Sequence, residues 1–338
     1  MKLLVLGAGE VHRLLAYDEC ADAMRGALAA LARGQVHQPL RTIIRPPGAA
    51  GMMALMPAYL SDGAAAPGTA AAGEAAYGLK AICIFPGNPA AGLDSHQGVV
   101  LLSSAQTGEP LAVLNASAVT EVRTAAVSAV ATELLARADA TELAIIGTGV
   151  QARAHLLAIA AARPLTRVRV AGRDPPRARQ FAEHMREHSP APVTACGSAA
   201  DAVAGAGIVV TATSSAEPVL RKDWLAPGAH INAVGACVPQ ARELDTETMA
   251  AAALFADSRE SVTSEAGDYL LARAEGAVGP EHIRAELGEL LIGAAPGRSG
   301  DGEITVFESL GLAAEDLAAA ELAYRKATEL GTGSWVEF

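Results

Sequence analysis

The stretch Thr141-Glu-Leu-Ala-Ile-Ile-Gly147-Thr-Gly149-Val-Gln-Ala152 decides the fold class. It has the pattern of an apolar strand that runs into a glycine-rich turn, which includes Val150, and then a helix expected from Gln151. In such a turn Gly147 permits the sharp change of direction, Gly149 lets the backbone approach a pyrophosphate, and Ala152 lets the helix pack close to the strand. The start of the helix offers N–H groups and a positive dipole end to phosphates. The pattern predicts binding of a nicotinamide dinucleotide, with an ordinary strand-to-helix turn as the alternative.

A second strand strengthens this prediction. The segment Arg167-Val-Arg-Val-Ala171 follows an intervening helical stretch, which completes a β-α-β unit. Apolar strands and amphipathic helices keep alternating as far as residue 256, an order typical of a parallel, doubly wound sheet. The expected strands are 143–146, 168–171, 192–195, 208–212, 231–235 and 253–256.

A similar segment at the N-terminus has a different interpretation. Leu3-Leu-Val-Leu-Gly7-Ala-Gly9-Glu-Val-His12 also combines a strand with a glycine turn. Its third position is His12, where a small residue is needed for close packing of helix and strand. A long amphipathic helix over residues 17–33 follows instead of a second strand. We therefore interpret this segment as an ordinary strand, turn and helix.

The remainder of the N-terminal third contains strands without helices between them, which predicts a mostly antiparallel sheet. The expected strands are 39–45, 52–59, 79–85, 98–102 and 111–115, the last two forming a hairpin. Residues 61–78 are rich in Ala and Gly and read as a flexible loop. Two long helices are expected at 117–137 and 313–330, and the latter is expected to return to the first domain.

Composition limits the class of protein. The chain has 338 residues, of which 51% are hydrophobic, which fits two packed domains. Its net charge of −11 makes nucleic acid or an anionic membrane an unexpected partner. The four cysteines are scattered without a C-x-x-C pair, and no signal peptide or membrane-spanning run is visible. We therefore expect a cytoplasmic protein without a disulfide framework.

Three basic residues lie in apolar surroundings and are candidates for the chemistry. Lys80 interrupts the strand Leu79-Lys-Ala-Ile-Cys-Ile-Phe85, where burial is costly unless the lysine is paired or functional. Its alternative is an exposed place on an edge strand. Arg41 lies in a strand, and Arg123 in an apolar helix, where it either forms an ion pair or points into a site. A guanidinium group suits bidentate binding of a carboxylate.

Further candidates follow strands of the parallel sheet, because ligands of such sheets lie beyond the carboxyl ends of the strands. Thr213 follows one strand, and Val234-Gly235-Ala-Cys237 ends another. Arg173 follows Gly172 at the end of the second strand, where an acidic residue would favour NAD. Arginine suits the 2′-phosphate of NADP, so NADP(H) is favoured. NAD(H) is the alternative, because the acidic Asp174 lies only one position further along.

Histidines give no strong signal. His184 and His188 are spaced i, i+4, but charged neighbours indicate a solvated helix face, and no metal site is expected. His96 lies in a polar segment and could either line a cleft or serve only in the loop.

Several segments together resemble the ornithine cyclodeaminase/mu-crystallin family, from about residue 10 to residue 325. They are Pro39-Leu-Arg41-Thr, Met56-Pro-Ala-Tyr59, Leu79-Lys80, Ser95-His-Gln97, Arg123-Thr-Ala-Ala-Val-Ser-Ala129, the glycine turn at 147–152, Pro227-Gly-Ala-His-Ile-Asn-Ala-Val-Gly235, Arg242-Glu-Leu-Asp245 and Ile304-Thr-Val-Phe-Glu-Ser-Leu-Gly311.

The resemblance implies a homodimer, an α/β fold and a Rossmann domain inserted in an α+β substrate-binding and dimerisation domain. The implied domains are 1–122 with 312–338, and 123–311. In the family, the residues matching Arg41 and Arg123 hold the substrate carboxylate, and the one matching Lys80 lies beside the reacting atoms and is the catalytic candidate. Leu310 is a further expected substrate contact. Cofactor contacts are implied for Ser95, Arg123, Gln151, Arg173, Thr213, Val234, Cys237 and Ser309, alongside the glycine turn and Gly235.

One position departs from part of the family. Ornithine cyclodeaminases and alanine dehydrogenases carry an aspartate general base where this chain has Cys237, whereas mu-crystallin, a ketimine reductase, has a serine. Cyclodeamination needs several proton transfers, and a thiol with an ordinary pKa of about 8.5 is a poor base near neutral pH. The resemblance therefore implies an NAD(P)H-dependent reductase of a cyclic or linear α-imino acid. Ornithine cyclodeaminase, an amino-acid dehydrogenase and a non-catalytic NADPH-dependent binding protein are the alternatives.

Overall fold

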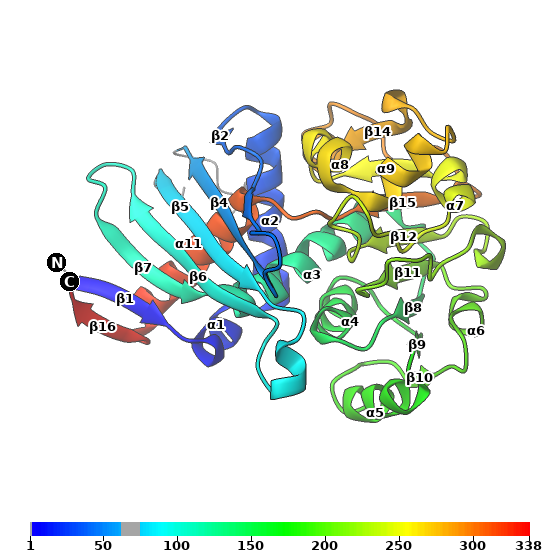
Figure 1. The fold of residues 1–338 in the computed structure, drawn as a ribbon, viewed down its shortest axis with the longest axis horizontal. Coiled ribbons are helices and arrows are strands. Elements are labelled where there is room, and N and C mark those ends of the chain that lie inside the picture. The colour runs from blue at the N-terminus through cyan, green and yellow to red at the C-terminus, as the bar shows by residue number, and fades with distance from the viewer. Residues whose placement is uncertain (1, 62–74) are drawn as a thin grey trace. The chain divides into compact units, whose positions relative to one another are not determined.

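The computed structural model describes residues 2–61 and 75–338. The chain divides into two compact units. Unit 1 comprises Met1–Arg123 and Gly311–Phe338, and unit 2 comprises Thr124–Leu310 (Figure 1). Helix α3 (Ala116–Leu135) contains the residues at which the chain passes from unit 1 into unit 2.

In the described residues, unit 1 is built on a sheet of eight strands. The order along the sheet is β16-β1-β7-β6-β5-β4-β2, and β3 also pairs with β4. Neighbouring strands are antiparallel except β1 and β7, which are parallel. The strands are β1 (Lys2–Leu6), β2 (Val36–His37), β3 (Thr42–Ile44), β4 (Met52–Leu60), β5 (Ala76–Ile84), β6 (His96–Ser104), β7 (Pro110–Asn115) and β16 (Ser334–Glu337).

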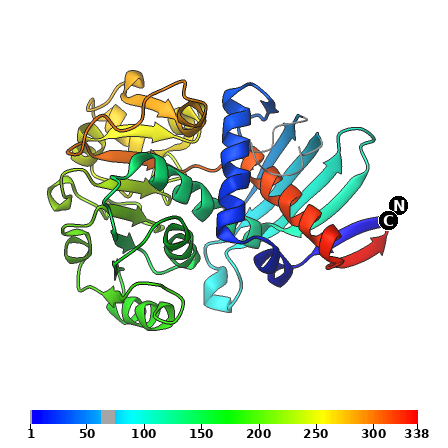
Figure 2. The same ribbon diagram turned by 180° about the vertical axis from the view of Figure 1, so that it is seen from behind.

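The two long helices of unit 1 lie on one face of its sheet. Helix α11 (Ala313–Leu330) packs on β4, β5 and β6, and α2 (Tyr17–Ala32) packs on α11 (Figure 2). The shorter helices are α1 (Ala8–Leu14) and the 3-10 turn η1 (Asn88–Ala91). Side chains alternate along each strand, so Lys80, Ile82, Val100 and Leu114 are buried on the strands' inward side.

The sequence predicted most of unit 1. The hairpin of β6 and β7 and the largely antiparallel sheet are confirmed. The strand expected over 39–45 is shorter, because only Thr42–Ile44 pair with β4. These three residues are exposed, and Arg41 lies outside the strand. The loop expected over 61–78 is wrong at its end, because residues 76–78 belong to β5 and pair with β6. Its residues 62–74 lie outside the described part of the chain.

Unit 2 contains a fully parallel sheet of eight strands in the order β10-β9-β8-β11-β12-β15-β13-β14. The chain moves outward from β8 to β10, then returns and adds β11 on the other side of β8. This reversal is the switch point at which doubly wound sheets bind ligands. The strands are β8 (Glu142–Ile146), β9 (Arg167–Ala171), β10 (Val193–Ala195), β11 (Ile208–Thr211), β12 (His230–Ala233), β13 (Ala253–Ala256), β14 (Ile283–Glu286) and β15 (Thr305–Glu308).

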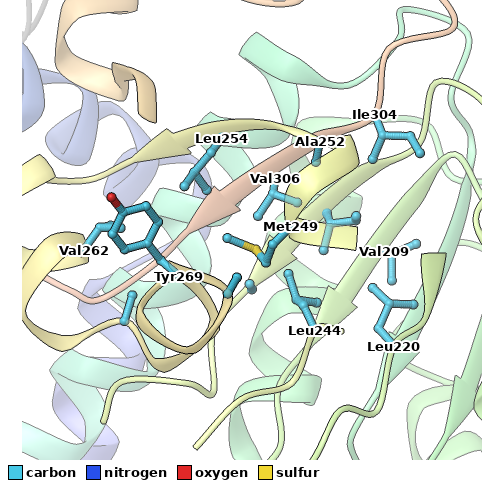
Figure 3. Close-up of a cluster of buried hydrophobic side chains, with 14 of the residues drawn as sticks. Val209, Leu220, Leu244, Met249, Ala252, Leu254, Val262, Tyr269, Ile304 and Val306 are labelled. Carbon is cyan, nitrogen blue, oxygen red and sulfur yellow. The ribbon is translucent and has the colours of Figure 1, made fainter. Parts of the chain in front are cut away.

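Helices cover this sheet and close its core. They are α4 (Val150–Ala162), α5 (Pro175–Met185), α6 (Ala199–Val203), α7 (Thr246–Ala251), α8 (Arg259–Glu265), α9 (Gly267–Ala274), α10 (Leu287–Leu291) and the 3-10 turns η2 (Lys222–Trp224) and η3 (Pro280–His282). Figure 3 shows one apolar cluster, in which Leu254 and Val306 of neighbouring strands meet Met249 and the buried ring of Tyr269. The expected α/β fold, with a doubly wound parallel sheet and a second mixed-sheet unit, is confirmed.

The N-terminal glycine segment forms strand β1 of the unit 1 sheet and then helix α1, which is the predicted order of strand, turn and helix. Strands β2, β14, β15 and β16 were not among the predicted strands. In the described part of the chain, the structure contains no helix that is both long and apolar enough to cross a membrane.

Candidate active site

The turn between β8 and α4 has the backbone that a dinucleotide site requires. Gly147 has a φ of +128°, a conformation that side chains rarely allow, and a Cβ there would lie 2.3 Å from the carbonyl oxygen of Ala212. Its N–H donates to Ala171 O across 2.8 Å, which fixes the turn between two strand ends. Only glycine fits this position without displacing the chain after β11.

The start of α4 leaves room for a ligand. Gly149 is the N-cap and has no side chain to cap the helix, and a Cβ placed on it would meet no atom within 4 Å. Ala152 is fully buried against the sheet, whereas Val150 is half exposed. A helix start with a bare backbone and open space beside it is suited to a phosphate group.

The end of β9 carries the groups that would distinguish NAD from NADP. Gly172 follows the strand, and Arg173 is exposed. Asp174, the competing acidic residue, is the N-cap of α5, where its carboxylate accepts from Arg177 N at 3.3 Å. The carboxylate therefore already serves the helix start, whereas the Arg173 side chain lies in solvent.

The ends of β11 and β12 are held together by a single carboxylate. Glu243 accepts a hydrogen bond from Thr213 N at 2.6 Å and another from Gly235 N at 2.7 Å. Val234, which precedes Gly235, is buried and bonds through its N–H to Thr211 O at 3.0 Å. Burial raises the pKa of Glu243, and these hydrogen bonds lower it. Glu243 thus fixes two loops that the sequence assigned to the cofactor.

The ends of β12 and β15 place Cys237 beside Ser309. The Cys237 thiol donates to Val234 O at 3.4 Å and to Ser309 O at 3.7 Å. The Ser309 hydroxyl is buried without a hydrogen-bond partner among the described residues. Leu310 is buried, and its N–H donates to Asp257 at 2.7 Å.

The predicted cofactor residues of unit 2 lie at the carboxyl ends of parallel strands or in the segments directly after them. The strained glycine turn, the open start of α4 and the orphaned Ser309 hydroxyl fit a nicotinamide dinucleotide. Residues 147–152 would hold the pyrophosphate, Arg173 the ribose end, and Thr213, Val234, Gly235, Cys237 and Ser309 the nicotinamide end.

Unit 1 contains a separate, charged site centred on Lys80. This residue lies in the central strand β5, opposite Met56 of β4 and Val100 of β6. Its side chain is 3% exposed, so the alternative of an exposed edge position is wrong. Its ammonium group lies 2.7 Å from Asp316 Oδ2 and donates to Thr120 Oγ1 at 3.5 Å.

Arg123 is buried beside it. Its Nε donates to Asp316 Oδ1 at 3.0 Å, and its Nη1 donates to Glu315 Oε2 at 2.8 Å. Both carboxylates belong to the first turn of α11. The ion pair that the sequence offered as one interpretation is present, and Lys80 belongs to the same charged group.

Arg41 approaches the same place from the segment before β3. Its Nη2 donates to Gly311 O at 3.1 Å. Gly311 has a φ of +81°, and a Cβ there would lie 2.6 Å from the guanidinium of Arg123. The structure therefore brings Arg41, Lys80 and Arg123 together around Gly311 and the start of α11.

The charges around Lys80 shift its protonation toward neutral pH. Burial lowers the pKa of Lys80 to about 8, and the charges of Arg123 and Arg41 act in the same direction, whereas Asp316 raises it. An amine with a pKa in this range both donates and accepts protons at physiological pH.

Ser95 lies next to this group. Its hydroxyl is 3.0 Å from Nδ1 of His96, the first residue of β6. Burial lowers the pKa of His96, and the charges of Lys80 and Arg123 lower it further, which shows that His96 is close to both. Among residues 2–61 and 75–338 no group of three or more His, Cys, Asp or Glu side chains could hold a metal ion.

Comparison with known proteins identifies the family. The model of the ornithine cyclodeaminase/mu-crystallin family matches residues 1–331. The chain belongs to this family.

Relatives within the family act on imino and amino acids. The ketimine reductase mu-crystallin of Mus musculus is 40% identical over 304 residues, which are 89% of this chain and 90% of that protein. A solved structure of Thermococcus litoralis Δ1-pyrroline-2-carboxylate reductase with NADH and L-proline has a TM-score of 0.92 and 37% identity and covers 98% of this chain and 99% of that one. An archaeal alanine dehydrogenase dimer with bound NAD has a TM-score of 0.91 and 31% identity, with both chains covered completely.

Three carboxylates of this family member were missed as site residues: Glu243, Glu315 and Asp316. The last two lie in Leu312-Ala-Ala-Glu-Asp-Leu-Ala-Ala-Ala320, where every residue is buried. An Ala-rich helix start with two adjacent acids is a signal in itself, because acids in such surroundings must be paired.

Proposed function

We propose that this protein is an NAD(P)H-dependent reductase of an α-imino acid, of the type of Δ1-pyrroline-2-carboxylate or Δ1-piperideine-2-carboxylate. The observation that carries the proposal is a buried lysine, Lys80, with a pKa of about 8 beside two guanidinium groups. A lysine of this kind beside two guanidinium groups suits a substrate that has a carboxylate and a nitrogen that takes up a proton. The mouse and Thermococcus relatives, named for imino-acid reduction, support the same substrate class.

The roles of the three basic residues follow from their chemistry. Arg41 and Arg123 hold the substrate carboxylate, because guanidinium groups bind carboxylates through paired charge-assisted hydrogen bonds. Lys80 donates a proton to the imine nitrogen. When bound, NAD(P)H supplies the hydride that the imine carbon takes up. The product is an amine in place of the C=N bond, and Lys80 regains its proton from solvent.

Cys237 favours reduction over cyclodeamination. Its thiol donates to two carbonyl oxygens, which a thiolate could not do. Reduction of a preformed imine needs one proton donor, and Lys80 suffices for it. Cyclodeamination of ornithine needs a general base for several proton transfers.

Arg173 supports NADP(H) as the preferred cofactor. It is exposed after β9, while Asp174 is engaged at the start of α5. Replacing Arg173 by Ala should lower the affinity for NADPH about ten-fold and leave that for NADH nearly unchanged. An equal loss of affinity for NADPH and NADH in a fluorescence titration would show that Arg173 does not bind the 2′-phosphate. The Thermococcus reductase and the archaeal alanine dehydrogenase structures contain NADH and NAD, so both cofactors belong in every assay.

A homodimer is the proposed assembly. On the face of the unit 1 sheet opposite α11, apolar residues lie side by side in register across five strands: Pro57, Leu79, Leu101, Val113 and Val5. All five are at least partly exposed. An apolar surface of this extent is typical of an interface between subunits. Wild type should elute at twice the chain mass of 34.3 kDa, and Leu101→Asp as a monomer, in light-scattering chromatography.

The experiment that tests the reaction follows the absorbance of NADPH, and in parallel of NADH, with each of the two cyclic imines. Rapid loss of absorbance that depends on the imine is the expected result. Absence of turnover with both imines would contradict the proposal. Ammonia release from L-ornithine without net use of cofactor would then indicate a cyclodeaminase, and cofactor reduction by L-alanine a dehydrogenase.

A further inference from the structure

The first turn of α11 brings two adjacent carboxylates into the charged site of unit 1. Glu315 and Asp316 are each 1% exposed. They approach Lys80 of β5 and Arg123 of α3, which lie more than 190 residues earlier in the sequence. Buried charges of this kind persist only where each has a partner in good geometry.

The two carboxylates have different partners. Asp316 contacts Lys80 through Oδ2 at 2.7 Å and Arg123 through Oδ1 at 3.0 Å. Glu315 Oε2 lies 2.8 Å from Arg123 Nη1 and also accepts from Leu312 N at 3.1 Å. Lys80 therefore has a direct ion pair with Asp316, and Glu315 is bonded to Arg123 and to the helix start.

We propose that Asp316 is a positioning residue that holds the Lys80 ammonium for proton donation, while Glu315 orients Arg123 for the substrate carboxylate. The inference rests on the proposed function for the identity of the proton acceptor. It assigns separate tasks to two neighbouring acids, neither of which touches the substrate in this scheme.

The charges around Lys80 explain why it needs Asp316. Arg123 of α3 and Arg41 before β3 are cationic and oppose the ammonium form, as does burial in the sheet. His96 of β6 lies near the same group, and burial and the charge of Lys80 lower its pKa, so it is neutral near pH 7 and adds no positive charge. Asp316 is the carboxylate that raises the pKa of Lys80. Without it, burial and like charge would leave a neutral amine near pH 7.

The proton step is balanced. One N–H bond of the Lys80 ammonium breaks as an N–H bond forms at the imine nitrogen, and Lys80 becomes a neutral amine. Asp316 remains a carboxylate throughout and directs the ammonium through its 2.7 Å contact. A proton from solvent then restores the ammonium before the next turnover.

The sequence permits a direct measurement of this proton. The chain has four lysines, Lys2, Lys80, Lys222 and Lys326. Protein labelled with 13C at the lysine ε-carbons gives four NMR signals, and the one missing from Lys80→Met belongs to Lys80. Its pH titration can be followed in wild type, Asp316→Asn, Asp316→Glu and Glu315→Gln, with NADPH binding as the check that each variant is folded.

In wild type the Lys80 signal should titrate near pH 8. It should move at least about 1 pH unit lower in Asp316→Asn, because an opposite charge at contact distance shifts a pKa by roughly 1–3 units. It should stay near its wild-type midpoint in Glu315→Gln and in Asp316→Glu. Equal midpoints in wild type and Asp316→Asn, or an equal shift in Glu315→Gln, would overturn the inference.

Kinetics provide the second measurement. Asp316→Glu keeps the charge but displaces it by one methylene, so kcat should fall about ten-fold or more with little change in KM. Glu315→Gln should instead raise KM with kcat nearly retained. A raised KM in Asp316→Glu together with a lowered kcat in Glu315→Gln would contradict the assignment. This test does not need Asp316→Asn, so it also applies if that variant is too unstable to study. If the protein shows the expected NMR shifts but does not turn over either imine, the proposed function is wrong, whereas the pairing of Asp316 with Lys80 still holds.

Discussion

The two candidate sites are built in opposite ways. In unit 2, the cofactor candidates follow successive strand ends, and the turn at 147–152 is made largely of backbone, with Gly147 fixed between β9 and β11. In unit 1, the site consists of charged side chains from Arg41, Lys80, Arg123 and the start of α11, which are distant in the sequence. A backbone site depends on the shape of the chain, whereas a site of buried charges depends on each partner being present. Substitutions in the two sites should therefore have different consequences.

The largest expected effect is on the chemical step in unit 1. Lys80→Met removes the proton donor, and general acids typically contribute about 10²–10⁴-fold to a rate. We expect kcat for the imine to fall by at least about 100-fold, with the dissociation constant of NADPH unchanged in a fluorescence titration. Lys222→Met, in the 3-10 turn of unit 2, is the control and should retain wild-type kcat. Near-normal turnover of Lys80→Met would rule out Lys80 as the acid.

The second effect separates the two arginines of the charged site. Arg123→Met leaves Glu315 without its 2.8 Å contact and Asp316 without one of two partners, and loss of one buried partner costs about 3–5 kcal/mol. Arg41 is only partly buried, so Arg41→Met should change the free energy of unfolding by less than about 1 kcal/mol.

Urea unfolding of both variants measures this difference. The KM for the imine should rise about 10–100-fold in Arg41→Met, as expected for a lost charged hydrogen bond. Equal destabilisation by the two substitutions would show that the ion pairs of Arg123 contribute little.

A third prediction concerns the glycine turn. Gly147→Ala places a Cβ against Ala212 O in a conformation that costs about 1–3 kcal/mol, so NADPH affinity should fall about 10–100-fold. Gly205→Ala is a matched control, because Gly205 has a φ of +75° but a Cβ there meets nothing within 4 Å. Isothermal titration of both variants measures the difference. Similar affinities would show that the close approach of the strand ends does not shape the cofactor site.

The smallest effect is the dependence on pH. Lys80 must be protonated to act as an acid, and its pKa of about 8 lies below the ordinary value of 10.5. The rate constant kcat/KM, which reports groups of the free enzyme, should therefore be lost as pH rises through 8, about ten-fold per unit above it. A basic limb near pH 10.5 would mean that Lys80 is not perturbed by its surroundings.

Features that are local in the sequence were easier to predict than features formed by distant segments. Strands of unit 2 are continuous apolar runs, so β8 and β11 were placed within one residue of their ends. Strand β15 was missed because Thr305 and Glu308 interrupt its apolar pattern, and both are buried polar residues. All four residues of β16 are exposed, so they carry no alternation that would signal a strand.

The candidate site shows the same limit. The glycine turn is encoded within twelve adjacent residues, and its backbone conformation follows from them. The contacts of Lys80 with Asp316 and of Arg123 with Glu315 join segments that only the packing of α11 on β5 brings together. The two adjacent acids in an Ala-rich helix start indicate that they are paired, but nothing local identifies Lys80 and Arg123 as their partners.

The position of unit 2 within the chain affects the order in which the sites can form during translation. Residues 124–310 are continuous, so the ribosome completes unit 2 before it releases the segment that contains α11. Until Glu315 and Asp316 emerge, Lys80 and Arg123 have been synthesised without their carboxylate partners. Maturation of the charged site is therefore a late, post-synthetic event, and a nascent chain stalled after residue 310 would contain every predicted unit 2 cofactor residue but lack both carboxylates.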